Sequence, residues 1–209
     1  MPVTLIASGV AYRHPCGDIL FSNIDLTVRP GERVAISAPS GTGKTTLCRI
    51  LAGYLRLSQG TVEIDGANIE SFAGRPMPVQ LLWQQPELAF DPRARVSRSL
   101  EDAGAVSKQS LERLLDRFDA KASWLNRYPH ELSGGALMRL SMVRALLVDP
   151  AYLIADEATA MLDAVTQAQL MGEMVRLTEE GLGLIFVSHS PSLVRRVSTR
   201  VFSLIDTPL

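Results

Sequence analysis

The chain has 209 residues, of which 46% are hydrophobic and 21% are charged. This composition is close to the globular average, and it excludes a disordered chain, a coiled coil and a collagen-like repeat. The 21 Lys and Arg residues against 22 Asp and Glu residues give a net charge of −1, which disfavours a nucleic-acid partner because phosphate binding usually brings a basic excess.

The chain length, the cysteines and the apolar segments limit the number of domains and the classes of protein further. At roughly 150 residues per domain, the chain is expected to form one domain, with room for a small subdomain. Cys16 and Cys48 are too few and too far apart for a disulfide framework or a zinc site, which favours reduced thiols. No apolar stretch reaches 18 residues, and residues 1–4 hold no basic segment of a secretory signal. The sequence therefore predicts a cytosolic protein without a membrane span.

The first half of the chain alternates between predicted strands and a helix. Three strands and one helix are expected there, at residues 3–7, 23–28, 33–37 and 45–52. Ile24, Leu26 and Val28 alternate with polar residues, which indicates a strand with one buried face. Residues 34–36 are apolar without alternation, as in a parallel strand that is covered on both faces.

The second half begins with a segment of a different kind. Between about Asp91 and Tyr128, apolar residues follow a helical spacing with no strand between them, at Leu111, Leu114, Leu115 and Phe118. Strands and helices then alternate again, at residues 152–155, 164–178, 184–187, 191–197 and 201–205. Buried strands that alternate with amphipathic helices indicate an α/β fold with a parallel sheet. Here the sheet carries a helical insertion.

The strongest local pattern lies between the third strand and the first helix. It is the phosphate-binding pattern Gly-x4-Gly-Lys-Ser/Thr, spelled here by Ala38, Pro39, Ser40, Gly41, Thr42, Gly43, Lys44 and Thr45, with Thr46 following. Glycines let the backbone curl so that its N–H groups converge on phosphate oxygens, and the helix points its positive end at the same anion. Lys44 is expected to contact the β- and γ-phosphates, and Thr45 to offer its hydroxyl to Mg²⁺. The alternative is a chance glycine-rich turn.

An acidic pair closes the predicted strand at 152–155. Asp156 and Glu157 follow a wholly apolar run, which places them at the carboxyl edge of the sheet, where α/β proteins bind ligands. Asp156 can hold Mg²⁺ through water, and Glu157 is then placed to act as general base on an attacking water. Alone, such a pair is more often a solvated turn or a helix cap, but the phosphate-binding pattern favours the catalytic interpretation.

The segment Leu132-Ser133-Gly134-Gly135 adds a family resemblance. It resembles the signature motif of ATP-binding cassette (ABC) ATPases, the motor subunits of ABC transporters, and further motifs follow in the family's order along nearly the whole chain. They are Tyr12 as the aromatic residue that stacks on adenine, residues 38–45 as the Walker A loop, Gln84 as the Q-loop glutamine, residues 152–157 as the Walker B strand with catalytic Glu157, Asp163 in the D-loop and His189 as the switch histidine.

The resemblance implies a fold and a working unit. The fold is a P-loop NTPase with a RecA-like, mostly parallel sheet core, an N-terminal antiparallel β subdomain and an inserted α-helical subdomain. Residues 1–209 form one such domain, with the core in residues 1–90 and 150–209 and the helical subdomain in about 91–149. Two domains pair head to tail and enclose MgATP, so that Ser133, Gly134 and Gly135 of one face the Walker A loop of the other.

Three of the residues assigned by this resemblance also have another interpretation. Tyr12 could be an ordinary strand aromatic residue, Gln85 competes with Gln84, and a histidine after a buried strand, such as His189, is usually structural. The resemblance favours Tyr12 for adenine stacking, Gln84 for Mg²⁺ and water, and His189 for the γ-phosphate. The other two histidines, His14 and His130, are expected to be surface or packing residues.

Four positions depart from the family pattern, namely Ala38, Ala136, Ala158 and Met161. Because the residues that carry the chemistry are all present, we expect an ATP-hydrolysing site. A non-hydrolysing or weakly active partner cassette in a heterodimer is the first alternative. A soluble ABC-type ATPase that serves DNA or the ribosome, and an unrelated P-loop kinase, are alternatives of other classes.

Other segments resemble one group of importers. The runs at residues 90–96, 128–131, 154–157 and 167–169 resemble those of importers of peptides, nickel and opine-type metallophores. This implies a second ATPase subunit, identical or different, two membrane permease subunits, an extracytoplasmic substrate-binding protein and a place at the cytoplasmic face of the inner membrane. Arg93, Arg95 and Arg98 are a candidate docking surface for a permease helix, or a solvated charged face. The ending at Leu209 predicts no regulatory domain and no cysteine-bearing tail.

Overall fold

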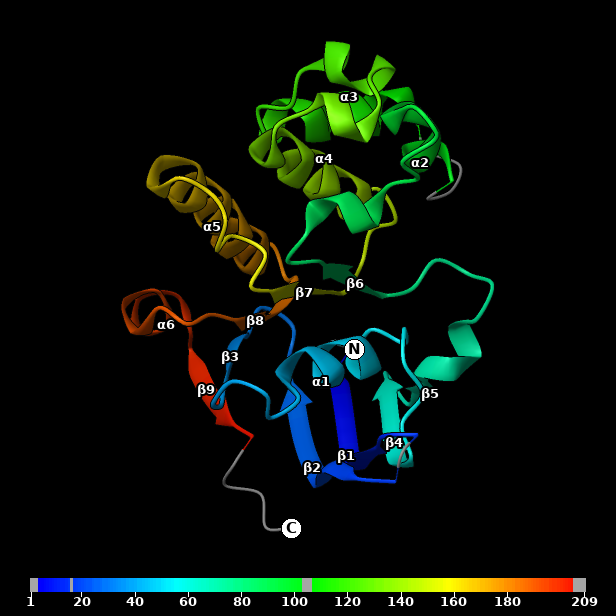
Figure 1. Cartoon of the computed structure of the whole chain (residues 1–209), viewed down its shortest axis with the longest axis vertical. Helices are drawn as coiled ribbons and strands as arrows, with labels where there is room; N and C mark the ends of the chain where they lie inside the picture. Colours follow the sequence, from blue (N-terminus) through cyan, green and yellow to red (C-terminus); the bar gives the residue numbers. More distant parts are fainter. Residues whose placement is uncertain (1–3, 16, 103–106, 205–209) are drawn as a thin grey trace.

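The computed structural model describes residues 4–15, 17–102 and 107–204. Figure 1 shows them in three tiers, with an antiparallel sheet at the bottom, a parallel sheet in the middle and a group of helices at the top. This arrangement confirms the expected fold class, an α/β P-loop core with an antiparallel sheet and added helices. Cys16 and the end of the predicted strand at 201–205 lie outside the described residues.

The antiparallel sheet has the strand order β2-β1-β4-β5. Its strands are β1 (Leu5–Arg13), β2 (Ile19–Val28), β4 (Gln59–Ile64) and β5 (Ala67–Asn68). β1 and β2 are longer than expected because a bulge near Gly9 and Asn23, both with positive φ, interrupts the alternation and hides it from a periodicity count. The extension carries β1 through Tyr12, close to the turn that leads into β2.

The parallel sheet has the order β6-β7-β8-β3-β9, and every neighbouring pair in it is parallel. Its strands are β3 (Arg33–Ser37), β6 (Val79–Leu82), β7 (Tyr152–Asp156), β8 (Gly183–Val187) and β9 (Arg200–Ser203). All residues of β7 and β8 are buried, as their unbroken apolar runs predict for strands covered on both faces. β6 was not predicted, since four residues are too few for a periodic signal.

Two cores hold the tiers together. In the first, Leu47, Cys48, Ile50 and Leu51 of helix α1 (Lys44–Leu51) pack between the two sheets. Tyr152 of β7 joins the same sheets, because its hydroxyl donates to the carbonyl of Val28 at 2.7 Å and accepts from the N–H of Leu5 at 3.1 Å. The second core lies on the other face of the parallel sheet, against the helices.

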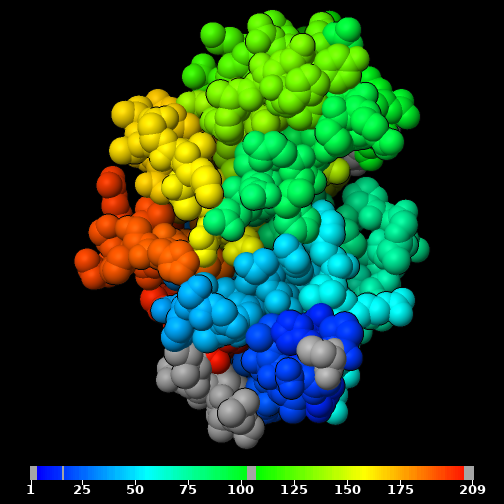
Figure 2. Space-filling view, in the orientation of Figure 1, coloured from blue at the N-terminus to red at the C-terminus, as the bar shows by residue number. Residues whose placement is uncertain are grey.

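We call residues 91–149 the helical region. It contains α2 (Val96–Glu101), α3 (Lys108–Arg117) and α4 (Gly134–Leu146), and no strand occurs among its described residues. The predicted stripe packs into the second core, where Leu115 and Phe118 are buried. α5 (Ala164–Glu179) and α6 (Pro191–Val197) follow β7 and β8. Figure 2 shows the helical region as the upper lobe of the molecule.

None of the helices in the described residues is both long enough and apolar enough to cross a membrane. α5, the longest of them, has 16 residues, whereas about 20 apolar residues are needed for a span.

Candidate active site

The phosphate loop, residues 38–45, leaves the carboxyl end of β3 and enters α1. Gly41 and Gly43 have φ of 82° and 97°, the left-handed region that glycine reaches without strain. Lys44 is buried, and its ammonium group donates to the carbonyls of Ala38 and Pro39 at 2.9 Å each. The loop therefore curls around its own lysine, whose charge lies where the backbone N–H groups at the start of α1 can share an anion.

Ala38 does not strain this loop. It is not among the described non-glycine residues with positive φ, so alanine fits where the pattern has glycine. Gly43 has no such freedom, because a Cβ there would lie 2.8 Å from Leu20 Cδ2 and 2.9 Å from Phe21 Cδ1. The second glycine of the loop is thus required by packing as well as by backbone conformation.

Asp156 and Thr45 are a hydrogen-bonded polar pair beside the phosphate loop. Asp156 is 5% exposed, and among the described residues its Oδ1 atom is buried without a hydrogen-bond partner. Burial raises the pKa of this carboxyl, a hydrogen bond from the Thr45 side chain opposes the rise, and the charge of Glu157 adds to it. A buried, unpaired carboxylate oxygen beside a hydroxyl is the oxygen-ligand set that Mg²⁺ prefers, so these residues fit a magnesium ion.

Glu157 is held between two polar side chains. Its Oε1 lies 2.7 Å from His189 Nε2, and its Oε2 accepts from Gln84 Nε2 at 3.4 Å. Glu157 also has a φ of 52°, a conformation that costs a non-glycine residue free energy and often marks a functional site. The turn is fixed because the Glu157 N–H donates to Val187 of β8 and its carbonyl accepts from Ala160. Gln84, Glu157 and His189, which follow the carboxyl ends of β6, β7 and β8, thus meet as predicted, with the other two side chains on the Glu157 carboxylate.

A cleft of about 290 Å³ joins these parts. It is lined by His14, Leu20, Ser40, Gly41, Gly43, Lys44, Thr45, Thr46, Glu157 and His189. We call His14 and Leu20, which lie at the turn between β1 and β2, the hairpin wall. Tyr12 is half-buried behind this wall, with its ring centroid 5.5 Å from that of His14.

From the sequence, His14 is expected to be a surface or packing residue. It does pack against Tyr12, but it also lines the cleft. The available signal was the spacing of two from Tyr12, since residues i and i+2 of an extended chain share a face.

The signature residues lie elsewhere. Ser133 caps α4, where its hydroxyl accepts from the N–H of Ala136 at 3.3 Å, and neither it nor Gly134 or Gly135 lines the cleft. Ser133 and Gly134 are exposed at the positive end of a 13-residue helix. An anion bound there would have to come from outside this chain's own cleft.

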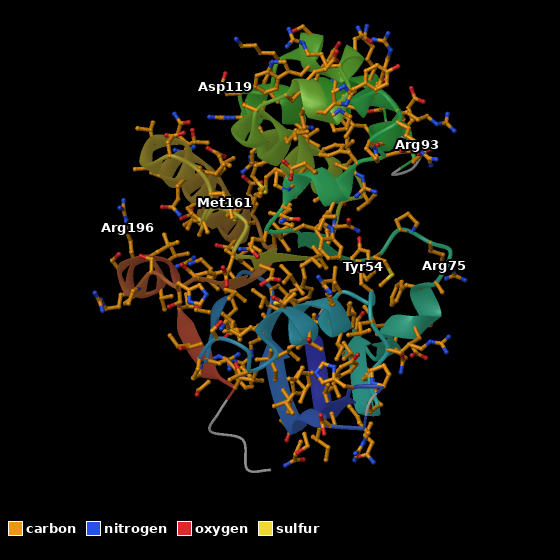
Figure 3. All side chains as sticks on the ribbon, in the orientation of Figure 1. Tyr54, Arg75, Arg93, Asp119, Met161 and Arg196 are labelled. Carbon is orange, nitrogen blue, oxygen red and sulfur yellow. The ribbon has the colours of Figure 1, made fainter. Side chains whose placement is uncertain are left out.

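Asp163 begins α5 as its cap. Its carboxylate accepts from the N–H groups of Val165 and Thr166 and from the Thr166 hydroxyl, and these hydrogen bonds lower the pKa of Asp163. Just before it, Met161 is 76% exposed on the loop that leads into α5 (Figure 3). Ala158 is buried beside Glu157. The loop after Glu157 therefore presents the long apolar side chain of Met161 to solvent.

The three arginines after the Q-loop are largely paired. Arg93 pairs with Asp91 at 3.4 Å, and Arg98 with Glu101 and Asp102 at 3.5 and 3.4 Å. Arg95 lies over the ring of Tyr128 at 5.6 Å. Since two of the three arginines pair with acidic neighbours and the third lies over a ring, this geometry favours the solvated face over a basic docking surface.

Comparison with known proteins points to one family. The sequence model of the family described as ABC transporter matches residues 21–160, more than half of the chain. A Brucella abortus (strain 2308) protein assigned by name to peptide import is 35% identical over 85% of this chain. The oligopeptide transport ATP-binding protein OppF of Streptococcus mutans is 30% identical over 86%, and the glutathione import ATP-binding protein GsiA of Pectobacterium atrosepticum is 35% identical over 82%.

The chain covers only part of the length of each of these relatives. The chain spans 58% of the length of the Brucella protein, 63% of OppF and 30% of GsiA.

Solved structures agree on the fold. The chain superposes with a TM-score of 0.83 on the ATP-binding cassette MJ0796 in a dimeric post-hydrolysis state bound to ADP and Pi, at 25% identity over 96% of this chain and 94% of that one. It superposes on cbiO1 of Clostridium perfringens, part of the transporter complex cbiONQ, with a TM-score of 0.81 at 23% identity, covering 98% of this chain and 85% of that one, which shows the fold alone.

Proposed function

We propose that this chain, which belongs to the ABC transporter family, is an ATP-hydrolysing subunit of an importer. The observation that carries the proposal is the placement of Glu157 between Gln84 and His189 at the mouth of the phosphate loop. A carboxylate held in this way can take a proton from a water molecule that attacks the terminal phosphate.

The roles of the loop residues follow from their present partners. In the structure the ammonium group of Lys44 donates hydrogen bonds to two loop carbonyls. With a nucleotide bound, it would donate to the β- and γ-phosphates instead. Ser40 to Thr46 would supply backbone N–H groups to the phosphates, with the start of α1 behind them. His189, whose side chain is 61% exposed, is free to leave Glu157 and contact the γ-phosphate.

Mg²⁺ would be held by Thr45 and Asp156, with Gln84 reaching it from the loop after β6. When bound, the ion supplies positive charge that offsets the charge of the phosphates. Asp156 contributes to this site because its burial leaves an oxygen that no group in the described part of the chain satisfies. Gln84 would contact both the ion and the attacking water, because it already donates a hydrogen bond to Glu157, the residue proposed to activate that water.

A second cassette would complete the site. Ser133, Gly134 and Gly135 are presented away from the cleft of their own chain, so we propose that they bind the terminal phosphate in the cleft of a partner, with Asp163 near the contact. MJ0796 is described as a dimer, which supports this pairing. In this proposal the chain is one cassette, with its helical subdomain at about 91–149 and its core in the remainder.

The importer context rests on the relatives. OppF is named for oligopeptide transport and GsiA for glutathione import, which supports a peptide-like cargo here. Nickel and metallophore cargo rest only on the short runs near residues 90–96 and stay a prediction. The partners proposed are a second ATPase subunit, two permease subunits and, through them, an extracytoplasmic binding protein, at the cytoplasmic face of the inner membrane.

Glu157→Gln tests the catalytic assignment. ATP hydrolysis by the purified chain, alone and with its membrane partners, should require Mg²⁺ and fall by about 10²- to 10⁴-fold in the variant, while ATP binding persists. Glu179→Gln, at the exposed end of α5, should hydrolyse ATP as the unaltered protein does. Undiminished hydrolysis by Glu157→Gln would refute the assignment. An unaltered chain that binds ATP but does not turn it over in the full complex would favour the non-hydrolysing partner cassette.

A further inference from the structure

Three planar side chains pack together just before the signature residues. The ring of Tyr128 is stacked on the imidazole of His130, with 5.6 Å between ring centroids and 16° between ring planes. The guanidinium carbon of Arg95 lies over the Tyr128 ring, 5.6 Å from its centroid. Arg95 and His130 are exposed, and Tyr128 is half-buried. We call these three residues the stack. The mechanism proposed above uses none of them.

The stack joins two segments that are distant along the chain. Besides lying over the ring, Arg95 donates a hydrogen bond to the carbonyl of Asn126. The N–H of Val96 donates to the carbonyl of Arg127 at 2.9 Å. The start of α2 is therefore tied to the segment that leads directly to Ser133, the cap of α4.

A tight turn connects the ring of Tyr128 with Ser133. The N–H of Tyr128 donates to Glu131 Oε2 at 2.8 Å, and the N–H of Glu131 donates back to the carbonyl of Tyr128 at 3.0 Å. The N–H of Leu132 donates to the carbonyl of Pro129 at 3.1 Å, and Pro129 is buried. Because these contacts leave the turn little conformational freedom, the place of the Tyr128 ring determines the place of Ser133.

We propose that Tyr128 is a positioning residue for ATP hydrolysis: the stack holds its ring, and the ring sets where Ser133 meets the nucleotide bound in the cleft of a partner cassette. This inference rests on the proposed function and adds a residue to it.

The sizes of two effects separate this role from a purely structural one. A cation over an exposed ring contributes little to stability. In contrast, a displacement of about 1 Å in a group that positions a substrate can lower the rate about 100-fold. Loss of the stack should therefore lower the rate of hydrolysis far more than it lowers stability.

Tyr128→Ala tests the proposal in the full chain assembled with its membrane partners. At saturating MgATP its turnover number should fall by about 10- to 100-fold. Binding of MgATP to the purified chain should not change, because Tyr128 does not line the cleft. The midpoint of urea unfolding should also stay close to that of the unaltered chain. Tyr128→Phe keeps the ring and should turn ATP over as the unaltered chain does.

A double-mutant cycle tests whether the two sides of the stack act together. Arg95→Ala should also lower turnover. The variant that carries both Arg95→Ala and Tyr128→Ala should lose less than the product of the two single losses, because the two changes remove one shared contact. If Tyr128→Ala fails to fold, Arg95→Ala supplies the comparison, since it alters an exposed side chain.

Arg93→Ala is the matched control. Arg93 lies two residues from Arg95, but its side chain is 89% exposed and pairs with Asp91 outside the stack. This variant should hydrolyse ATP as the unaltered chain does when the purified chain is assayed.

Three results would overturn the proposal. The first is unchanged turnover in Tyr128→Ala, and the second is a double variant whose loss equals the product of the single losses. The third is a loss of stability or of MgATP binding as large as the loss of turnover, which would make Tyr128 a structural residue. An unaltered chain that does not hydrolyse ATP in the full complex would overturn the proposed function itself, and this outcome is distinguished because it needs no variant.

Discussion

At the cleft, one residue has a strained backbone and a neighbouring carboxylate oxygen lacks a hydrogen-bond partner among the described residues, whereas paired charges tie the helical region to the core. Glu157 has a positive φ, and among the residues that the structure describes, Asp156 Oδ1 is buried without a hydrogen-bond partner. Across the molecule, Arg117 of α3 donates to Glu180 at 2.7 and 2.8 Å and to Glu173 at 3.2 Å, all within one ion-pair group. Glu173 and Glu180 belong to α5 and its end, so this group ties the helical region to the core.

The difference indicates what each region is for. Strain and unmet hydrogen-bonding capacity cost stability in the free protein and are recovered only when a ligand arrives. The paired charges of Arg117 hold α3 of the helical region against α5, the helix that follows the loop beginning at Glu157. The cleft therefore has the features of a ligand-binding site, whereas the contacts of the helical region hold its helices in place against the core. The four predictions below test this contrast, from the largest expected effect to the smallest.

Gly43→Ala should destabilise the cleft most. Its Cβ would lie 2.8 Å from Leu20 at a φ of 97°, so strain and overpacking together should cost about 2–4 kcal/mol and abolish ATP binding. Gly41→Ala is the control, because its φ is also positive but nothing lies within 4 Å of the added carbon. Urea unfolding and ATP titration measure both. Equal losses in the two variants would show that packing against the hairpin wall does not matter.

Tyr152→Phe should destabilise the joint between the two sheets. The phenol both donates to Val28 and accepts from Leu5, and burial raises its pKa to about 12, so it stays neutral and bonded at ordinary pH. Removing the hydroxyl leaves the Val28 carbonyl and the Leu5 N–H without this hydrogen-bond partner. The loss should lower the free energy of unfolding, measured with urea, by about 1–3 kcal/mol. A stability equal to that of the unaltered chain would show that water replaces the hydroxyl.

Arg117→Ala should loosen the helical region. Its guanidinium is 25% exposed and holds two glutamates, so its loss should cost about 1 kcal/mol, more than a fully solvated pair is worth. Lys108→Ala removes an exposed cation from the same helix, where its pair with Glu112 spans 3.8 Å, and should have no measurable effect. If the two variants unfold at the same urea concentration, the Arg117 group does not hold the region in place.

Asp156→Asn should have the smallest effect and the opposite sign. Burial raises the pKa of this carboxyl above its ordinary value of 3.8, so its favourable contribution to stability exists at low pH and is lost as pH rises through the raised pKa. The variant should therefore melt about 1–2 °C higher at pH 7.5, and the gain should shrink toward pH 4.5. Added Mg²⁺ and ATP should stabilise the unaltered chain but not the variant. A lower melting temperature in the variant at pH 7.5 would mean that Asp156 is already satisfied in the free protein.

Much of the fold could be predicted because its strands are of the buried, parallel kind. Residues 33–37 form β3 as expected, and the strands near 152 and 184 begin and end within a residue or two of their predicted bounds. The missed strands, β4, β5 and β6, are short or begin with residues that do not favour strands, so they form because partners pair with them. Pairing of that kind leaves no mark in a local pattern.

The sequence by itself determined the phosphate loop, the buried strand ending in Asp156 and Glu157, and the helical character of residues 91–149, because each is written in adjacent or periodic residues. Only the tertiary structure decided which side chains meet. It brought Gln84 and His189 onto one carboxylate, left Asp156 Oδ1 without a partner among the described residues and placed His14 in the cleft wall. These outcomes depend on the order of strands in the parallel sheet and on the fit of a hairpin against Gly43, which are long-range contacts that no single segment encodes.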